Sequence, residues 1–159
     1  MPYGAAMSEP QDMTAMLNAT LDGWNQAMGL RFVSATKDEV VAELVIGAQH
    51  RQPYGIVHGG VHAGIIETVA SVGAALFAMP DGRSVVGLEN STSFLHAVRE
   101  GKLVVTARPL TRGRRTQVWE GVVKDDAGRT AATGRVRLLC LEADVALAGK
   151  KVSVEPPST

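Results

Sequence analysis

The sequence predicts an α+β fold in which an antiparallel β-sheet packs against one long helix. Residues 59–79 are the one long segment with helical periodicity, and Pro80, Asp81 and Gly82 end it with helix-breaking chemistry. Strand-like segments lie on both sides of this helix, and four of them follow it at regular intervals. The turns between these four are short, which is typical of antiparallel neighbours.

The composition fits a single globular domain. The chain has 159 residues, of which 45% are hydrophobic and 20% are charged. Its 16 basic residues balance 16 acidic ones, and this lack of net charge argues against a dedicated nucleic-acid binder. One cysteine, Cys140, excludes an internal disulfide and a zinc site built on paired cysteines.

The domain is expected to span residues 12–142, with flexible tails at 1–11 and 143–159. The first residues lack a basic stretch followed by an apolar core, and no apolar run approaches the roughly 20 residues of a membrane span. We therefore expect a cytoplasmic protein with no membrane partner and no nucleic-acid partner.

The elements follow one another in a simple order. Asp12 or Thr14 is expected to cap a short helix that runs to Trp24. Residues 30–47 predict two strands, and residues 48–60 form a loop rich in Gln, His, Pro and Gly. After the long helix, strands are expected within residues 83–98, 101–111, 115–125 and 129–142.

The long helix has two contrasting faces. An apolar stripe at steps of three and four is expected to face the core, and it consists of Val61, Ile65, Thr68, Val69, Val72 and Leu76. The members of the opposite face are small except for one carboxylate: Gly60, Gly64, Glu67, Ser71, Ala74 and Ala78. This face suggests close packing by another helix or a substrate. The plainer alternative is a solvated Glu67.

The loop before this helix adds groups that suit acyl transfer. His58, Gly59 and Gly60 stand where the helix begins, and a helix N-terminus presents unpaired N–H groups with a partial positive charge. Such amides stabilise an oxyanion that develops on a carbonyl. Gln52 supplies an amide side chain six residues before His58, and Glu67 lies two turns along the helix.

These residues resemble the active-site segment of hotdog-fold acyl-CoA thioesterases. The segment is QPYGIVHGG at 52–60 with Glu67 and Ser71, and the similarity continues through residues 86–89, 97–101, 112–113 and 117–120. It covers roughly residues 25–141 and is strongest for the PaaI-like family, which includes enterobactin proofreading thioesterases and Arthrobacter-type 4-hydroxybenzoyl-CoA thioesterases.

The resemblance implies a curved antiparallel sheet wrapped around one central helix, and hydrolysis of an acyl-CoA or aryl-CoA thioester. It places the catalytic acid at Glu67, as general base or nucleophile, and the helix-tip amides at Gly59 and Gly60. Gln52, His58 and Ser71 complete the implied catalytic set. Family members form homodimers with active sites between subunits, and many pair again into homotetramers. No cofactor and no metal are implied.

Candidate substrate-binding residues lie in two places. Arg112, Gly113, Arg114 and Arg115 form a turn whose guanidinium groups match CoA phosphates, unless the turn is simply solvated. Thr92 and Ser93 interrupt an apolar strand, where they either edge the substrate channel or serve as ordinary strand hydroxyls.

The remaining histidines are expected to have lesser roles. His62 is expected to be structural or to line the substrate, because it lies about 140° around the helix from Glu67. His50 is expected to be solvated.

Two other functions remain open at this stage. One is a hotdog-fold hydratase or dehydratase, and the other is a non-catalytic acyl-CoA-binding or sensor module. The acyl group, and the choice between CoA and a carrier protein, are also open.

Overall fold

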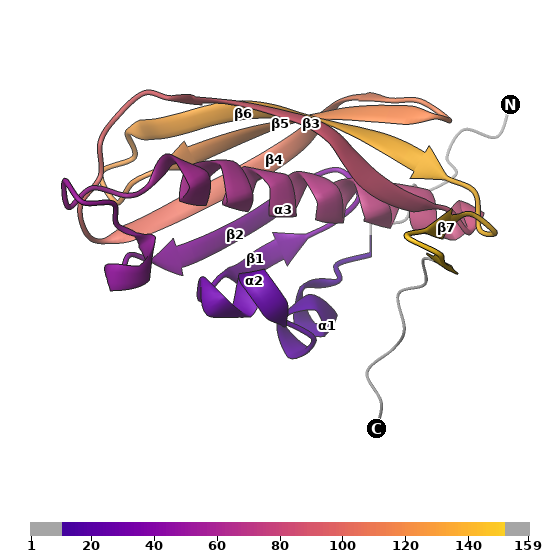
Figure 1. Ribbon diagram of the computed structural model, residues 1–159, viewed down its shortest axis with the longest axis horizontal. Helices are drawn as coiled ribbons and strands as arrows, with labels where there is room; N and C mark the ends of the chain where they lie inside the picture. Colours follow the sequence, from indigo (N-terminus) through magenta and orange to yellow (C-terminus); the bar gives the residue numbers. More distant parts are fainter. Residues whose placement is uncertain (1–10, 152–159) are drawn as a thin grey trace, which may run out of the picture.

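The computed structural model describes residues 11–151, and helix α3 (Gly59–Ala78) lies along one face of a six-stranded antiparallel sheet (Figure 1). The strands are β1 (Arg31–Ala35), β2 (Val40–Val45), β3 (Ser84–Phe94), β4 (Lys102–Arg112), β5 (Thr116–Lys124) and β6 (Thr130–Leu141). Their order across the sheet is β1-β2-β4-β5-β6-β3, so β1 and β3 form the two edges. The predicted fold class is confirmed.

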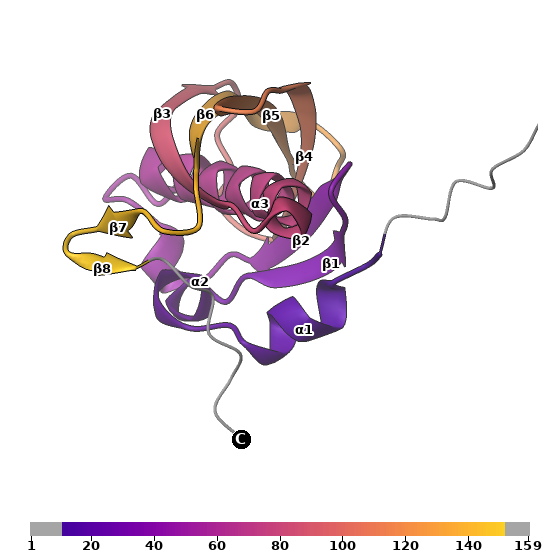
Figure 2. The same cartoon turned by 90° about the vertical axis from the view of Figure 1, so that its right-hand side faces the viewer.

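The sheet curves around α3 instead of lying flat beneath it, as the view along the helix shows (Figure 2). Strands β3 to β6 arch over one side of the helix, and β1 and β2 continue the curve around another. The helix is therefore buried more widely than its sequence predicted. Ile66, Ala70 and Gly73 are also buried, and Ala74 and Ala78, which were placed on the open face, are fully covered.

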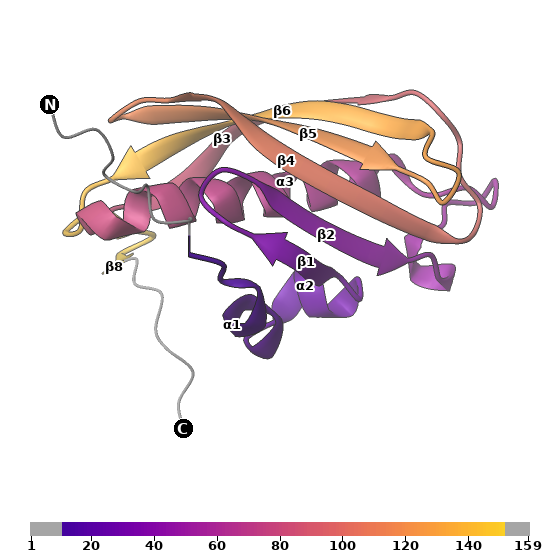
Figure 3. The same cartoon turned by 180° about the vertical axis from the view of Figure 1, so that it is seen from behind.

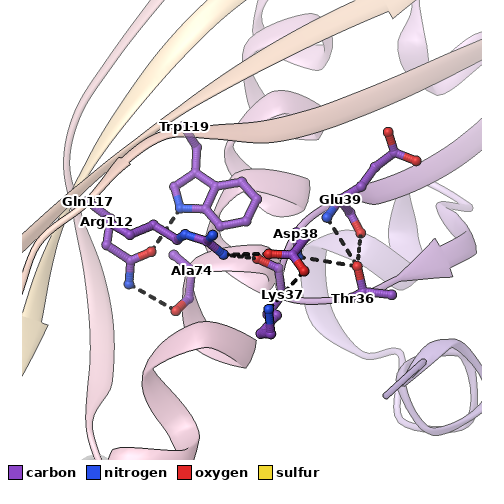
Figure 4. Close-up of polar contacts among 8 residues, drawn as sticks. All are labelled: Thr36, Lys37, Asp38, Glu39, Ala74, Arg112, Gln117 and Trp119. Atoms are coloured by element: carbon purple, nitrogen blue, oxygen red, sulfur yellow. Dashed lines mark hydrogen bonds and ion pairs between the residues drawn. The ribbon is translucent and has the colours of Figure 1, made fainter. Parts of the chain in front are cut away.

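Helix α3 approaches the sheet closely at Gly73, which faces the side chain of Trp119 on β5. Gly73 lies against the ring of Trp119 on β5, and a β-carbon at this position would overlap that ring. The Trp119 Nε1 donates to Gln117 Oε1 at 2.9 Å, and Gln117 Nε2 donates to the Ala74 carbonyl at 3.1 Å (Figure 4). These bonds satisfy polar groups in the buried layer beneath the sheet.

The segment before the sheet forms two short helices, where one continuous helix was expected. Helix α1 (Thr14–Ala19) and helix α2 (Gly23–Ala27) are separated at Asp22, whose backbone is extended, and Gly23 has a positive φ of 52°. The break was not predicted because the helical spacing of the apolar residues continues across it. The predicted cap was wrong: Met13 is the N-cap of α1 and makes no side-chain capping bond, whereas Asp12, one residue earlier, accepts the Thr14 N–H through Oδ1 at 2.9 Å.

One edge of the sheet is occupied by the side chain of a residue on α1. The Asn18 amide pairs with the backbone of Phe32 on β1, donating to its carbonyl and accepting its N–H, both at 2.9 Å. The Met13 N–H also donates to the Ala35 carbonyl at 2.9 Å. The backbone of β1 is therefore hydrogen-bonded on both sides.

His50 is buried, so the expectation that it is solvated was wrong. It lies in the 3₁₀ turn η1 (Ala48–His50), where its Nδ1 accepts the Gly47 N–H at 2.7 Å. Its Nε2 lies 2.8 Å from the Met28 carbonyl, which assigns the proton to Nε2. A buried imidazole was not foreseeable here because its partners come from two separate segments.

Helix α3 also corrects an expectation about apolar runs. With the following turn η2 (Met79–Asp81) it spans 23 residues with a mean hydropathy of 1.6, which by length and composition alone would suffice to cross a membrane. Half of the apolar stretch is buried inside the domain, where α3 packs against the sheet.

The expected tails fall partly outside the described residues. Residues 1–10 and 152–159 lie outside them. Within 143–151, strands β7 (Ala146–Leu147) and β8 (Lys150–Lys151) form a small antiparallel hairpin next to the main sheet (Figure 2).

Candidate active site

A cavity of about 560 Å³ opens at the N-terminus of α3. Four of the predicted site residues line it: Gln52, His58, Gly59 and Gly60. The opposite wall comes from the end of β3 and the segment after it, including Phe94, Leu95 and His96. The structure thus brings the predicted loop and helix tip together around one space.

The two helix-tip amides have different surroundings. His58 caps α3, and its Nδ1 accepts the Gly60 N–H at 2.8 Å. The Gly59 N–H has no acceptor among the described residues. Because Nδ1 accepts, the His58 ring proton resides on Nε2, and this N–H is a second donor at the tip. Gly59 is therefore the open backbone donor, whereas Gly60 holds the capping histidine.

A tight turn shapes the loop that precedes the tip. The Gly55 N–H donates to the Gln52 carbonyl at 2.8 Å, and the Gln52 N–H donates to the Ile56 carbonyl at 2.9 Å. The Gln52 side chain accepts the Tyr54 N–H through Oε1 at 3.2 Å. Its Nε2 group has no acceptor within residues 11–151 and remains available beside the cavity.

Glu67 and Ser71 lie further along α3, on the side that faces β3. The Glu67 carboxylate accepts Asn90 Nδ2 at 2.9 Å through Oε2, and Ser71 Oγ lies 3.5 Å from Oε1. Asn90 was not predicted from the sequence. The available signal was strand alternation, because Asn90 and Thr92 lie two residues apart and share the face that looks toward α3.

The helix tip and the carboxylate of one chain are too far apart to act on the same carbonyl. Glu67 is eight residues beyond Gly59 in a continuous helix, which corresponds to about 12 Å along the axis. A catalytic base must come within hydrogen-bond reach of the reacting group. Within one chain, Gly59 and Glu67 are therefore separated along α3 by more than hydrogen-bond reach.

His62 lines the cavity and is only 4% exposed. Its Nδ1 is buried without a hydrogen-bond partner in the part of the chain described, and its ring lies 6.2 Å from that of Phe94. Burial lowers the pKa of His62, because the charged imidazolium would lose its hydration. This placement agrees with the expected structural or substrate-lining role.

The arginine turn lies at the other end of α3, where β4 runs into β5 (Figure 3). Arg112 makes its contacts within the chain. It pairs with Asp38 at 2.7 Å (Figure 4), and its guanidinium lies over the Phe77 ring, 4.6 Å from the ring centroid. Hydrogen bonds from Lys37 and then from Arg112 lower the pKa of Asp38. Arg114 and Arg115 are exposed, and the Gly113 N–H closes the turn on the Thr116 carbonyl at 2.8 Å.

The two candidate hydroxyls on β3 have different environments. Thr92 Oγ1 donates to Asn90 Oδ1 at 2.6 Å, so this hydroxyl belongs to the surroundings of Glu67. Ser93 is exposed and pairs with Thr133 in the ladder with β6. A further hollow of about 670 Å³ lies between β4 and β5 and contains none of the predicted site residues. Residues 11–151 contain no cluster of three potential metal-ligating side chains.

A curved antiparallel sheet around one helix, with an open amide at the helix tip and a carboxylate two turns along, defines the class of hotdog-fold thioesterases. Comparison with known proteins agrees. Residues 54–132 match the model of the family described as "Thioesterase superfamily". The chain belongs to this family, so its activity is the hydrolysis of a thioester.

Individual relatives show how far the similarity extends. Rv1847 of Mycobacterium tuberculosis, named as an esterase, is 40% identical over 86% of this chain and 99% of its own length. Its solved structure superposes with a TM-score of 0.75 over 77% of this chain and 98% of that one. The proofreading thioesterase EntH of Cronobacter turicensis is 36% identical over 76% of this chain and 88% of its own. The structure of thioesterase HI1161 of Haemophilus influenzae is 27% identical, with a TM-score of 0.76 over 81% of this chain and 90% of that one.

The buried His62 makes stability depend on pH. In the unfolded chain His62 titrates near its ordinary pKa of 6.5, whereas burial lowers its pKa in the folded protein. Below about pH 6.5, the unfolded chain protonates His62 more readily than the folded protein does. As the pH falls, the free energy of unfolding therefore decreases by on the order of 1 kcal/mol per pH unit. We expect His62→Leu to lose this part of the pH dependence. Urea unfolding at about pH 7.5 and about pH 5.5 measures the change in the free energy of unfolding between the two pH values. The same change in wild type and in His62→Leu would contradict the assignment.

Proposed function

We propose that this protein hydrolyses acyl-CoA or aryl-CoA thioesters to the free acid and CoA. The observation that carries the proposal is the unpaired Gly59 N–H, which borders a cavity at the tip of α3. The carbonyl oxygen of a thioester bound in this cavity would accept hydrogen bonds from the Gly59 N–H and from His58 Nε2. Both donors stabilise negative charge as it develops on the oxygen.

Glu67 supplies the second half of the chemistry. As a general base it takes a proton from water, and the water oxygen adds to the carbonyl carbon. Collapse of the tetrahedral oxyanion breaks the C–S bond, and the proton passes from Glu67 to the departing CoA thiolate. As a nucleophile, Glu67 instead forms an anhydride with release of the thiolate, and water then hydrolyses the anhydride. Gln52 and Ser71 position the carbonyl and the water in either route.

We further propose a homodimer, formed through β3, as the smallest unit with complete active sites. The outer backbone of β3 has no partner within the described residues, and Leu88, Phe94 and Leu95 on or next to this strand are 50%, 59% and 60% exposed. Antiparallel pairing of two β3 strands about a two-fold axis sets the α3 helices antiparallel, with each tip beside the partner's carboxylate. Pairing of two dimers would give the homotetramer implied by the resemblance.

The same pairing offers a place for the nucleotide end of CoA. The arginine turn lies far from the tip of its own α3, and a two-fold axis through β3 brings the turn of the partner subunit toward that tip. Arg114 and Arg115 are exposed there, with Arg114 3.6 Å from the exposed Glu142 carboxylate, whereas Arg112 is held by Asp38. Guanidinium groups suit the phosphates of CoA.

Replacing the carboxylate tests the chemistry. We expect Glu67→Gln to lower kcat for thiol release by about 10²–10⁴-fold with little change in KM, because a general base of this kind contributes that much. Glu120→Gln on β5 is the matched control, since this carboxylate pairs with Arg135 away from the outer edge of β3 and should leave kcat unchanged. Normal kcat in a folded Glu67→Gln protein would overturn the mechanism. Acyl-CoA binding without thiol release would instead indicate a binding module, and hydration of an enoyl-CoA would indicate a hydratase.

Hybrid dimers test whether the sites lie between subunits. Glu67→Gln removes the carboxylate, and Gly59→Pro removes the open N–H at the first helix position, where the backbone accepts proline. The added β-carbon would displace the exposed ring of Phe94. Hybrids of one chain of each kind, isolated with two different tags, contain one intact site and should show about half of the wild-type kcat. Activity no higher than the average of the two variant homodimers would place each site within a single chain.

The CoA contact is tested with two thioesters of the same acyl group. We expect Arg114→Ala/Arg115→Ala to raise KM about tenfold for the acyl-CoA, since the phosphates lose about 1.4 kcal/mol of interaction, and little for the acyl-pantetheine. The control Arg31→Ala/Arg108→Ala removes the same charge from other exposed positions. Equal changes in KM for both thioesters would remove the arginine turn from the substrate site.

A further inference from the structure

The two oxygens of the Glu67 carboxylate are held unequally. Oε2 accepts a hydrogen bond from Asn90 Nδ2 at 2.9 Å, a length typical of a charge-assisted bond. Oε1 has only Ser71 Oγ at 3.5 Å, which is at the limit of a hydrogen bond. One oxygen is thus anchored, and the other keeps its lone pairs largely unused.

Asn90 is itself fixed by partners on both sides of its carboxamide. Its Nδ2 also donates to the Ala63 carbonyl at 3.0 Å, and its Oδ1 accepts Thr92 Oγ1 at 2.6 Å. A backbone carbonyl can only accept, so the amide nitrogen must face α3. Both N–H groups of Asn90 are used, one on the helix backbone and one on Glu67. The carboxamide therefore ties the carboxylate to a defined point on α3.

Gly87 leaves the other oxygen open on the side of β3. A β-carbon at this position would lie 2.5 Å from Glu67 Oε1, closer than such atoms approach. With glycine here, no side chain of this strand position displaces or covers Oε1. Strand β3 thus holds one oxygen of the carboxylate and makes room for the other.

We propose that Asn90 is a positioning residue for Glu67, which anchors Oε2 so that Oε1 is the oxygen that reacts. This inference rests on the proposed thioester hydrolysis. In that reaction Oε1 takes the proton of water, or attacks the carbonyl carbon, while Oε2 keeps its bond to Asn90.

Two variants of Asn90 separate positioning from packing. Asn90→Leu keeps the approximate size and removes the donor, and Asn90→Asp keeps the shape and places a second carboxylate beside Glu67. We expect either change to lower kcat for acyl-CoA by about 10–100-fold, because a small misplacement of a catalytic group has an effect of this size. KM should change little for either variant. For Asn90→Asp alone, the acid limb of the kcat profile should also move to higher pH, because two neighbouring carboxylates disfavour ionisation.

The same substitution in a Glu67→Gln background distinguishes this inference from the proposed function. There Asn90→Leu should cause no further loss, because the group that it positions is gone. Ser91→Ala, next in the strand, is the control for a general change in β3. If Glu67→Gln abolishes thiol release but both Asn90 variants keep the wild-type kcat and acid limb, the positioning role is wrong and the proposed function stands. If Glu67→Gln is fully active, both fail.

Discussion

The enclosure of α3 by the sheet is the constraint on which the rest of the structure depends. The sheet curves around the helix, and close contacts such as that of Gly73 with Trp119 leave no space between the two. The N-terminal tip of α3 borders a cavity, and Glu67 is partly exposed on the side that faces β3. The two groups proposed to react with a substrate, at Gly59 and Glu67, lie at these two places.

This geometry also explains why the site is divided. The residues that could polarise a carbonyl are at the beginning of a rigid helix, and the carboxylate is about 12 Å further along the same helix. A helix fully packed against a sheet cannot bend to bring them together. In the proposed dimer, a second chain that approaches at β3 would supply the group that the first chain cannot bring to the same carbonyl.

Much of the fold could be predicted from the sequence, but less of the candidate site. Helical spacing in residues 59–79 and regular turns predicted α3 and the antiparallel strands, because these signals are local. The surroundings of Glu67 depend on which residue of β3 lies opposite which turn of α3, and this register is a property of the whole domain. The contact of Asn90 with Glu67 and the pairing of Arg112 with Asp38 could therefore not be predicted from the sequence. The break at Asp22 was hidden because apolar spacing continued through it.

The side chain of Asn18 has a consequence for assembly. By taking up the outer hydrogen-bonding groups of Phe32, it leaves the sheet with only one edge at which another strand can add. A sheet with two free edges can extend without limit, copy after copy, as in fibrils. In the proposed dimer, the addition of a second copy at β3 would use the remaining free edge of both chains. Asn18 and Met13, which bond the outer backbone of β1, would then limit further strand addition and favour closed assemblies.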